Sequence, residues 1–141
     1  MLNKHRDISF ILYLGDHLAH NNWEQKKEDH LKALQNFTGM LKKLRIPVYS
    51  ALGNHEGYPS DQFDATGTNE HSWIIEGSLS TWKDWFTEEM NKTFRENGCY
   101  SVIVPGTTLK LISLTPFTMM SNNLYLWGNQ TDPLGVVSVI S

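Results

Sequence analysis

The sequence lacks several features that would place it in a special class of protein. Its single cysteine, Cys99, cannot form a disulfide within the chain, so we expect it to be a small buried apolar side chain. No apolar run reaches the roughly 18 residues of a membrane-spanning helix. The first residues, MLNKHRD, lack the apolar core of a signal peptide. These absences exclude a disulfide framework and a transmembrane segment within this sequence.

Clusters of positive charge are also scarce. The net charge is −3, and the one basic cluster, LKKLR at 41–45, fits the solvated end of a helix, where cations favour the helix dipole. Because nucleic-acid binding needs a concentrated positive face, we expect no nucleic-acid partner. With 40% hydrophobic and 11% aromatic residues, the 141-residue chain has the composition of one globular domain.

The first third of the chain predicts a strand, a helix and a second strand. Residues 8–14, ISFILYL, form a continuous apolar run typical of a strand buried on both faces. Residues 23–44 place apolar side chains three and four positions apart, which predicts an amphipathic helix with one apolar stripe: Leu31, Leu34, Phe37, Leu41 and Leu44. Pro47 ends the helical pattern, and 47–52 predicts the second strand. This order predicts a βαβ unit with two parallel strands.

The rest of the chain predicts helices and a hairpin. Residues 57–71 have the composition of a surface loop, and 72–94 predict one or two helices interrupted near Gly77-Ser78, whose aromatic side chains pack on the sheet. Two strand-like runs, 99–104 and 109–114, flank Pro105-Gly106 and predict an antiparallel hairpin. Residues 115–130 predict a loop, and Asp132-Pro133 is typical of a helix start.

Polar residues follow both strands of the predicted βαβ unit. GDHLAH places Asp16 and His20 after the first strand, and GNHE places Asn54 and His55 after the second. Because adjacent parallel strands end at the same edge of a sheet, we expect Asp16 and Asn54 to be neighbours in space. A bridging carboxylate and a neutral amide oxygen suit a site with two divalent cations, of the kind that hydrolyses phosphate esters. A histidine that does not bind metal, such as His55, can protonate the leaving alkoxide, and His20 can contact a phosphate oxygen.

The two motifs differ in specificity. Alone, the GD motif also fits an ordinary turn, whereas GNHE directly after an apolar strand, paired with GD across one helix, is much more specific. We interpret His17 as part of the local structure. We expect the remaining histidines, His5, His30 and His71, to be solvated.

The sequence resembles the calcineurin-like metallophosphoesterases through GD and GNHE, and more closely their acid sphingomyelinase branch. The segments that carry the likeness are GDHLAH, PVYSALGNHEGYPSDQF, GCYSVIVPGTTLKLISL and NQTDPLG, in that order, from about residue 8 to residue 135. The resemblance implies an α/β fold, part of a metallophosphoesterase β-sandwich flanked by helices around a central βαβ unit. It also implies two Zn²⁺ ions, with Asp16 and Asn54 as metal ligands and His55 and His20 as catalytic residues. The implied reaction is hydrolysis of sphingomyelin to ceramide and phosphocholine.

The sequence departs from this pattern at the remaining metal ligands. The family site also needs an earlier Asp-x-His and a later His-x-His, which this chain does not contain. We therefore expect residues 1–141 to be a partial metallophosphoesterase domain, truncated at both ends, with 136–141 as a tail foreign to the family. As given, the chain is predicted to be inactive, with partial or no zinc occupancy.

Two other functions fit the same residues. One is a non-catalytic secreted scaffold or binding fragment. The other is a family member that acts on nucleotide-type phosphodiesters, with its substrate specificity set by its loops. Three Asn-x-Ser/Thr sequons, at Asn36, Asn91 and Asn129, favour a secreted or lysosomal glycoprotein. A phosphodiester, in the implied case sphingomyelin at a membrane surface, is the expected partner.

Overall fold

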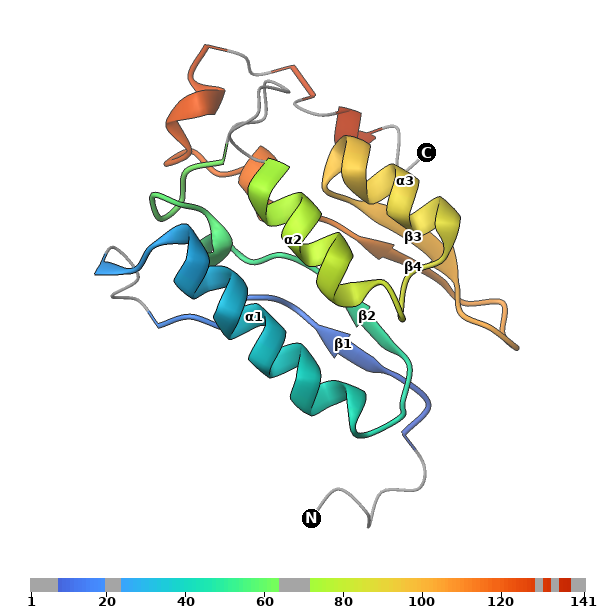
Figure 1. Ribbon diagram of the computed structural model, residues 1–141. Helices are drawn as coiled ribbons and strands as arrows, with labels where there is room; N and C mark the ends of the chain where they lie inside the picture. The colour runs from blue at the N-terminus through green and yellow to red at the C-terminus, as the bar shows by residue number, and fades with distance from the viewer. Residues whose placement is uncertain (1–7, 20–23, 64–71, 129–130, 133–134, 138–141) are drawn as a thin grey trace.

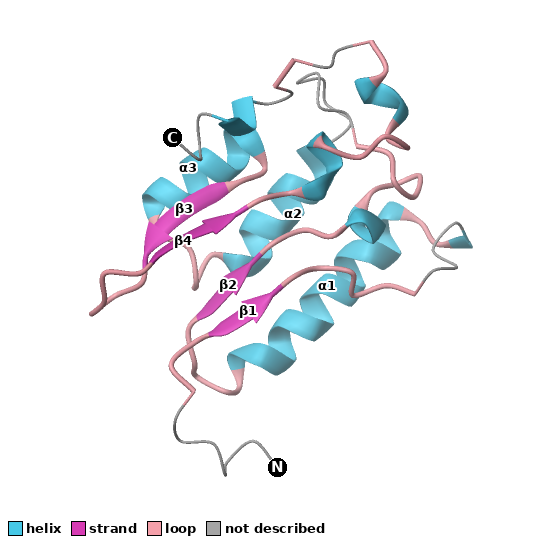
Figure 2. Cartoon of the chain, turned by 180° about the vertical axis from the view of Figure 1, so that it is seen from behind, coloured by secondary structure: helices cyan, strands magenta, loops and turns pink. Residues whose placement is uncertain are grey.

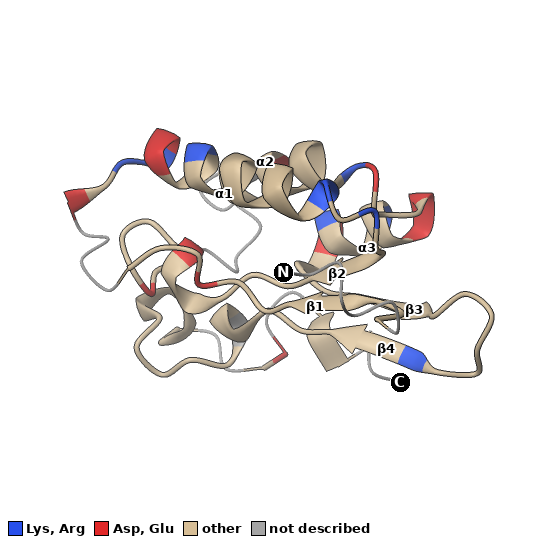
Figure 3. Ribbon diagram, turned by 90° about the horizontal axis from the view of Figure 1, so that it is seen from below, with Lys and Arg blue, Asp and Glu red and all other residues tan. Residues whose placement is uncertain are grey.

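A computed structural model describes residues 8–19, 24–63, 72–128, 131–132 and 135–137 of the chain (Figure 1). In these residues two pairs of short strands lie on one side and the α-helices lie on the other, as Figure 3 shows. The expected α/β class is confirmed. His5, His20, His71 and Asn129 lie outside the described residues.

The predicted βαβ unit is present. Strand β1 (Ile11–Tyr13) pairs in parallel with β2 (Val48–Ser50), and Leu12 is opposite Tyr49. Helix α1 (Lys27–Lys42) connects them. The buried residues of α1 differ in part from the predicted apolar stripe. They are His30, Leu34 and Thr38, of which only Leu34 belongs to that stripe.

Two helices follow, and their break lies further along the chain than the sequence predicts. Helix α2 (Ser72–Trp82) runs through Gly77, and α3 (Glu88–Asn97) begins after Thr87, whose hydroxyl accepts a hydrogen bond from the Met90 N–H at 3.2 Å. Gly77 is retained inside the helix because a Cβ there would lie 2.2 Å from Cδ2 of Leu31 on α1. This glycine therefore lets two helices approach closely and does not interrupt α2.

The predicted hairpin is also present. Strand β3 (Tyr100–Ile103) pairs antiparallel with β4 (Lys110–Ser113), and Figure 2 shows this pair beside β2. Side chains join the two pairs, because the Tyr100 hydroxyl and the Ser113 hydroxyl both donate to the Ser50 carbonyl, at 2.9 and 3.1 Å. Two short 3₁₀ turns, η4 (Pro116–Thr118) and η5 (Leu124–Leu126), occupy the predicted 115–130 loop.

The core lies between the strands and the helices. Trp82 is fully buried, and its ring packs edge-on against Tyr13 at 6.1 Å, which confirms the expected packing role of the α2 aromatics. Cys99 is fully buried, as predicted. The prediction that 8–14 is buried on both faces is wrong, because Leu12 and Leu14 on the face away from the helices are 54% and 72% exposed. No described segment covers that face.

Candidate functional site

The loops after β1 and β2 meet, as the two motifs predict. Gly15 has a φ of +78°, and a Cβ on it would lie 2.0 Å from the Gly53 backbone nitrogen. A Cβ on Gly53 would lie 2.1 Å from Oδ1 of Asp16. Both positions therefore require glycine, because no larger residue allows the two backbones to come this close. In GD and GNHE, the glycines bring the two loops together.

Asp16 lies directly over the second loop. Its backbone has a φ of +54°, a left-handed conformation that aspartate tolerates better than most residues. Its Oδ1 accepts a hydrogen bond from the His55 N–H at 3.0 Å. The Asn54 amide nitrogen donates to Oδ1 of Asp61 at 2.9 Å, so Asp61 holds this side chain in place. Asp16 thus contacts the 3₁₀ turn η3 (Asn54–Glu56), which begins with the second candidate ligand.

Glu56 binds the two loops together, a role that the sequence analysis did not assign. Its side chain is fully buried and accepts hydrogen bonds from the backbone N–H groups of Asp16 at 2.9 Å, His17 at 3.1 Å and Gly53 at 2.5 Å. Burial raises the pKa of this carboxyl, but the bond and charge of His17 and the backbone bonds outweigh it and lower the pKa below its ordinary value. Its position three residues after Gly53 is the spacing of a capping box, which is the signal that could have revealed it.

His17 completes this buried polar group. Its Nδ1 lies 2.9 Å from Glu56 Oε1 and 2.7 Å from the Tyr13 hydroxyl, and its Nε2 lies 3.3 Å from the His30 carbonyl. The interpretation of His17 as local structure fits these contacts. Burial raises the pKa of Tyr13, and the nearby carboxylates of Glu56 and Asp16 raise it further, so this tyrosine stays protonated.

The expectation that His30 is solvated is wrong. Its side chain is fully buried, with ring contacts to Tyr58 at 6.1 Å and Trp73 at 5.8 Å. Burial lowers its pKa, which favours the neutral imidazole. Among the described residues neither ring nitrogen has a hydrogen-bond partner. His30 therefore serves as a packing residue between α1 and the start of α2.

His55 lies at the junction of the two loops and is 9% exposed. Its Nδ1 lies 3.1 Å from the Leu18 carbonyl. Since a carbonyl only accepts hydrogen bonds, Nδ1 carries the ring proton, which makes Nε2 the basic nitrogen of the neutral ring. This is the tautomer that a proton-transferring histidine requires if it acts through Nε2.

The described residues do not form a complete metal site. Asp16 contacts the turn that begins with Asn54 through the His55 N–H, and the Glu56 carboxylate is already engaged by three backbone donors. In the part of the chain that the structure describes, no group of three or more His, Cys, Asp or Glu side chains could hold an ion. One carboxylate and one amide therefore fit a fraction of a two-metal site and not the whole of it.

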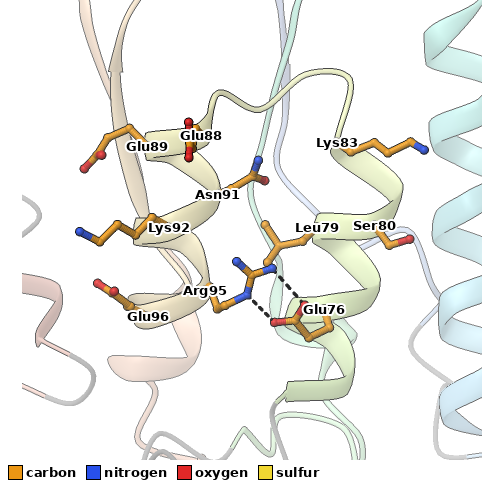
Figure 4. Close-up of a pocket in the computed structure, with 10 residues that line it drawn as sticks. All are labelled: Glu76, Leu79, Ser80, Lys83, Glu88, Glu89, Asn91, Lys92, Arg95 and Glu96. Atoms are coloured by element: carbon orange, nitrogen blue, oxygen red, sulfur yellow. Dashed lines mark hydrogen bonds and ion pairs between the residues drawn. The ribbon is translucent and has the colours of Figure 1, made fainter.

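Two surface grooves lie elsewhere. One, of about 900 Å³, runs between α2 and α3, where Arg95 pairs with Glu76 at 2.7 Å (Figure 4). Another, of about 510 Å³, is lined mainly by apolar residues such as Phe10, Trp85 and Val104. Neither lining includes Asp16, Asn54 or His55. No helix of the described residues combines the length and apolar character needed to cross a membrane.

Comparison with known proteins supports the resemblance read from the motifs. Residues 1–136 match the family model described as calcineurin-like phosphoesterase. The chain is 36% identical over 133 residues to a sphingomyelin phosphodiesterase from Bos taurus and 35% identical over 133 residues to one from Homo sapiens, in both cases over 91% of this chain. It is 30% identical over 136 residues, 93% of this chain, to the cyclic GMP-AMP phosphodiesterase SMPDL3A from Bos taurus, of which it covers 29%. The chain spans about a fifth (21%) of the length of the two sphingomyelin phosphodiesterases.

Proposed function

Because this chain belongs to the calcineurin-like phosphoesterases, in the branch similar to sphingomyelin phosphodiesterases, we propose that it carries part of the site of a metal-dependent phosphodiester hydrolase of that type. Its substrate would be sphingomyelin, cleaved to ceramide and phosphocholine. The proposal rests on one observation: two glycine turns bring Asp16 against the Asn54-His55 turn, with Asp16 Oδ1 3.0 Å from the His55 nitrogen.

The residues of the two loops would have distinct roles. Asp16 and Asn54 would each give an oxygen to a divalent ion, for which we propose zinc, two ions being needed in a complete site. His55 would transfer a proton through Nε2, since the Leu18 carbonyl engages Nδ1. His20, outside the described residues, would contact a phosphate oxygen. Residues 1–141 would form a partial domain of this family, in which about 8–135 carry the likeness and 136–141 are a tail foreign to the family.

Two alternatives keep specific support. A nucleotide-type phosphodiester is favoured by the 30% identity to the cyclic GMP-AMP phosphodiesterase. A non-catalytic scaffold is favoured by the incomplete set of metal donors among the described residues. Substrate assays separate the first alternative from our proposal, and metal binding separates the second.

A secreted or lysosomal location fits the proposed function and the sequons. Asn36 is exposed on α1 and could carry an N-glycan, whereas Asn91 is only partly exposed on α3. Asn129 is the third proposed glycan position. Digestion with an N-glycosidase, followed by mass measurement of the protein secreted from a eukaryotic cell, tests all three.

Metal titration tests the ligand assignment. We expect the purified chain to bind Zn²⁺ weakly and below stoichiometry, and Asp16→Asn to weaken that binding at least about tenfold. Asparagine can still accept the His55 N–H bond, so the variant removes charge without removing the turn contact. Glu76→Gln, which changes an exposed carboxylate paired with Arg95, is the matched control and should leave zinc affinity unchanged.

The same preparation should show no turnover of a chromogenic phosphodiester. Near-stoichiometric zinc together with turnover would refute the prediction that this chain is inactive. Zinc binding that is equal in Asp16→Asn and in the unmodified chain would remove Asp16 from the ligand set.

A further inference from the structure

The segment that follows β4 combines an absence of charge with exposed apolar side chains. Residues 111–131 contain no Asp, Glu, Lys or Arg. Within this stretch we name residues 116–128 the apolar loop. Four of its large side chains are exposed, by 62%, 56%, 41% and 68% in turn: Met119, Leu124, Tyr125 and Trp127. Several exposed large apolar side chains on one uncharged loop are typical of an interaction surface.

The apolar loop is held in one conformation by its own polar groups. Asn123 is fully buried, donates to the carbonyls of Phe63 and Phe117 at 2.8 and 2.9 Å, and accepts from the Phe63 and Tyr125 N–H groups at 3.3 Å. The rings of Phe63 and Phe117 stack at 4.5 Å. The Trp127 indole nitrogen donates to the Ser121 carbonyl at 2.9 Å, so even this highly exposed ring is fixed. The backbone of the apolar loop is therefore held in a set conformation.

This loop is anchored beside the candidate site. The Gln62 side chain donates to the Asn122 carbonyl and accepts from the Leu124 N–H, both at 3.0 Å. The residue before it, Asp61, accepts the hydrogen bond from Asn54. Figure 1 shows the apolar loop at the same end of the molecule as the segment 53–63. A surface bound by the apolar loop would thus lie next to the Asp16 and Asn54 turns.

We propose that the apolar loop inserts its exposed side chains into the interface between a lipid bilayer and water. Trp127 and Tyr125 each combine an apolar ring with a polar atom, the combination favoured at membrane interfaces, and Leu124 and Met119 supply purely apolar groups. The net charge of −3 argues against attachment through anionic lipids, so burial of apolar surface must provide the attraction. Four side chains on one loop also make a smaller patch than the 20 to 30 residues of a typical protein interface.

The purpose of this contact rests on the proposed function, because it would bring a lipid phosphodiester to the two turns. The contact itself does not depend on hydrolysis. Binding is measured by co-sedimentation of the chain with vesicles of neutral phosphatidylcholine. We expect binding that is equal at about 0.1 M and about 0.5 M NaCl, since no cation takes part.

Leu124→Asp should weaken this binding roughly tenfold to hundredfold, the loss expected when one leucine no longer leaves water. The control is Leu12→Asp, since Leu12 is 54% exposed on the outer face of β1 and Leu124 is 56% exposed. Met40→Asp, at a 57% exposed position of α1, is a second control that does not disturb a strand. Thermal melting of each variant verifies that it folds.

A spectroscopic signature locates the contact. Brominated phosphatidylcholine should quench the fluorescence of Trp127, and Trp127→Phe should abolish most of the quenching while retaining most of the binding. The proposal would be overturned if the unmodified chain does not bind vesicles, or if Leu12→Asp and Leu124→Asp lose binding equally. It would also be overturned if the chain forms a dimer without lipid and Leu124→Asp dissociates that dimer. Vesicle binding through the apolar loop without any phosphodiester hydrolysis would uphold it and count against the proposed function alone.

Discussion

Replacement of Glu56 by glutamine tests whether this buried carboxylate holds the two site loops together. The glutamine has the same shape, but one of its two oxygens becomes an NH₂ group that cannot accept a hydrogen bond. In Glu56, Oε2 accepts from Asp16 and Gly53, and Oε1 faces both the backbone N–H and the ring of His17. A glutamine can keep the pair at Oε2, but it then turns its NH₂ group toward the His17 N–H.

The size of the effect follows from these contacts. A buried N–H left without an acceptor costs about 1–3 kcal/mol, and loss of the bond between a charged carboxylate and the His17 ring adds a similar amount. We therefore expect Glu56→Gln to lower the free energy of unfolding by about 2–4 kcal/mol. Glu56→Ala would leave three backbone donors, those of Asp16, His17 and Gly53, without their acceptor, and the loss would be a large part of the roughly 5–15 kcal/mol that stabilises a typical domain.

Urea unfolding measures the global change, and amide hydrogen exchange by NMR measures the local one. In Glu56→Gln, the exchange rate of the His17 amide should rise by at least about tenfold beyond the change seen for core amides such as that of Phe94. Glu76→Gln, in which the exposed partner of Arg95 is changed, should affect neither measurement at these loops. A uniform rise in exchange over the whole chain, with no excess at His17, would refute the positioning role.

The pH dependence gives an independent check. Because the pKa of Glu56 is lowered in the folded chain, its charge stabilises the fold above the ordinary glutamate pKa of 4.5. This contribution is lost as the pH falls from there through the lowered pKa. The unmodified chain should therefore lose stability over this range more steeply than Glu56→Gln, and parallel stability curves would contradict the assignment.

Two further substitutions test the framework of the loops and the strands. Gly15→Ala should cost at least about 2 kcal/mol of unfolding free energy, because φ is +78° and the new Cβ would meet the Gly53 nitrogen. The control, Gly39→Ala on α1, has nothing within 4 Å of the new Cβ and should stabilise the chain slightly. Equal effects of the two variants in urea unfolding would disprove the close approach. Tyr100→Phe removes the hydroxyl that donates to the Ser50 carbonyl and should lower the free energy of unfolding by about 1 kcal/mol, as measured by thermal unfolding. The control, Tyr125→Phe on the exposed loop, should cause no measurable change. Unchanged stability of Tyr100→Phe would show that this bond does not stabilise the contact between the strand pairs.

Local sequence signals predicted the βαβ unit and the hairpin of this fold. Apolar runs and helical spacing predicted β1, α1 and β2 in their parallel order, and a Pro-Gly turn predicted the hairpin. The errors arose where distant segments decide the outcome. Gly77 is a helix breaker by propensity, but the Leu31 side chain packs against it and the helix continues. His30 is surrounded in sequence by charged residues, yet Tyr58 and Trp73 cover it from other segments.

Exposure of β1 is a similar case. A continuous apolar run predicts burial on both faces, since parallel strands are normally covered on both sides. Tyr13 meets this expectation through its contacts with Phe37 and Trp82, but Leu12 and Leu14 point to the face that no described segment covers. The apolar run therefore predicted the strand correctly but not its one-sided burial among the described residues.

In this site, the residues that bring the two loops together differ from the residues proposed to bind metal and substrate. The groups that bring the loops together are Gly15, Gly53 and the buried Glu56 carboxylate, none of which we propose as a metal ligand or a substrate contact. Their contacts are local to the two loops, so the meeting of the loops that carry Asp16 and Asn54 does not need the remaining donors to be present. A two-metal site, in contrast, needs donors from more strands than these two. The framework can thus be complete while the ligand set is not, and for this reason we predict ordered loops together with weak zinc binding.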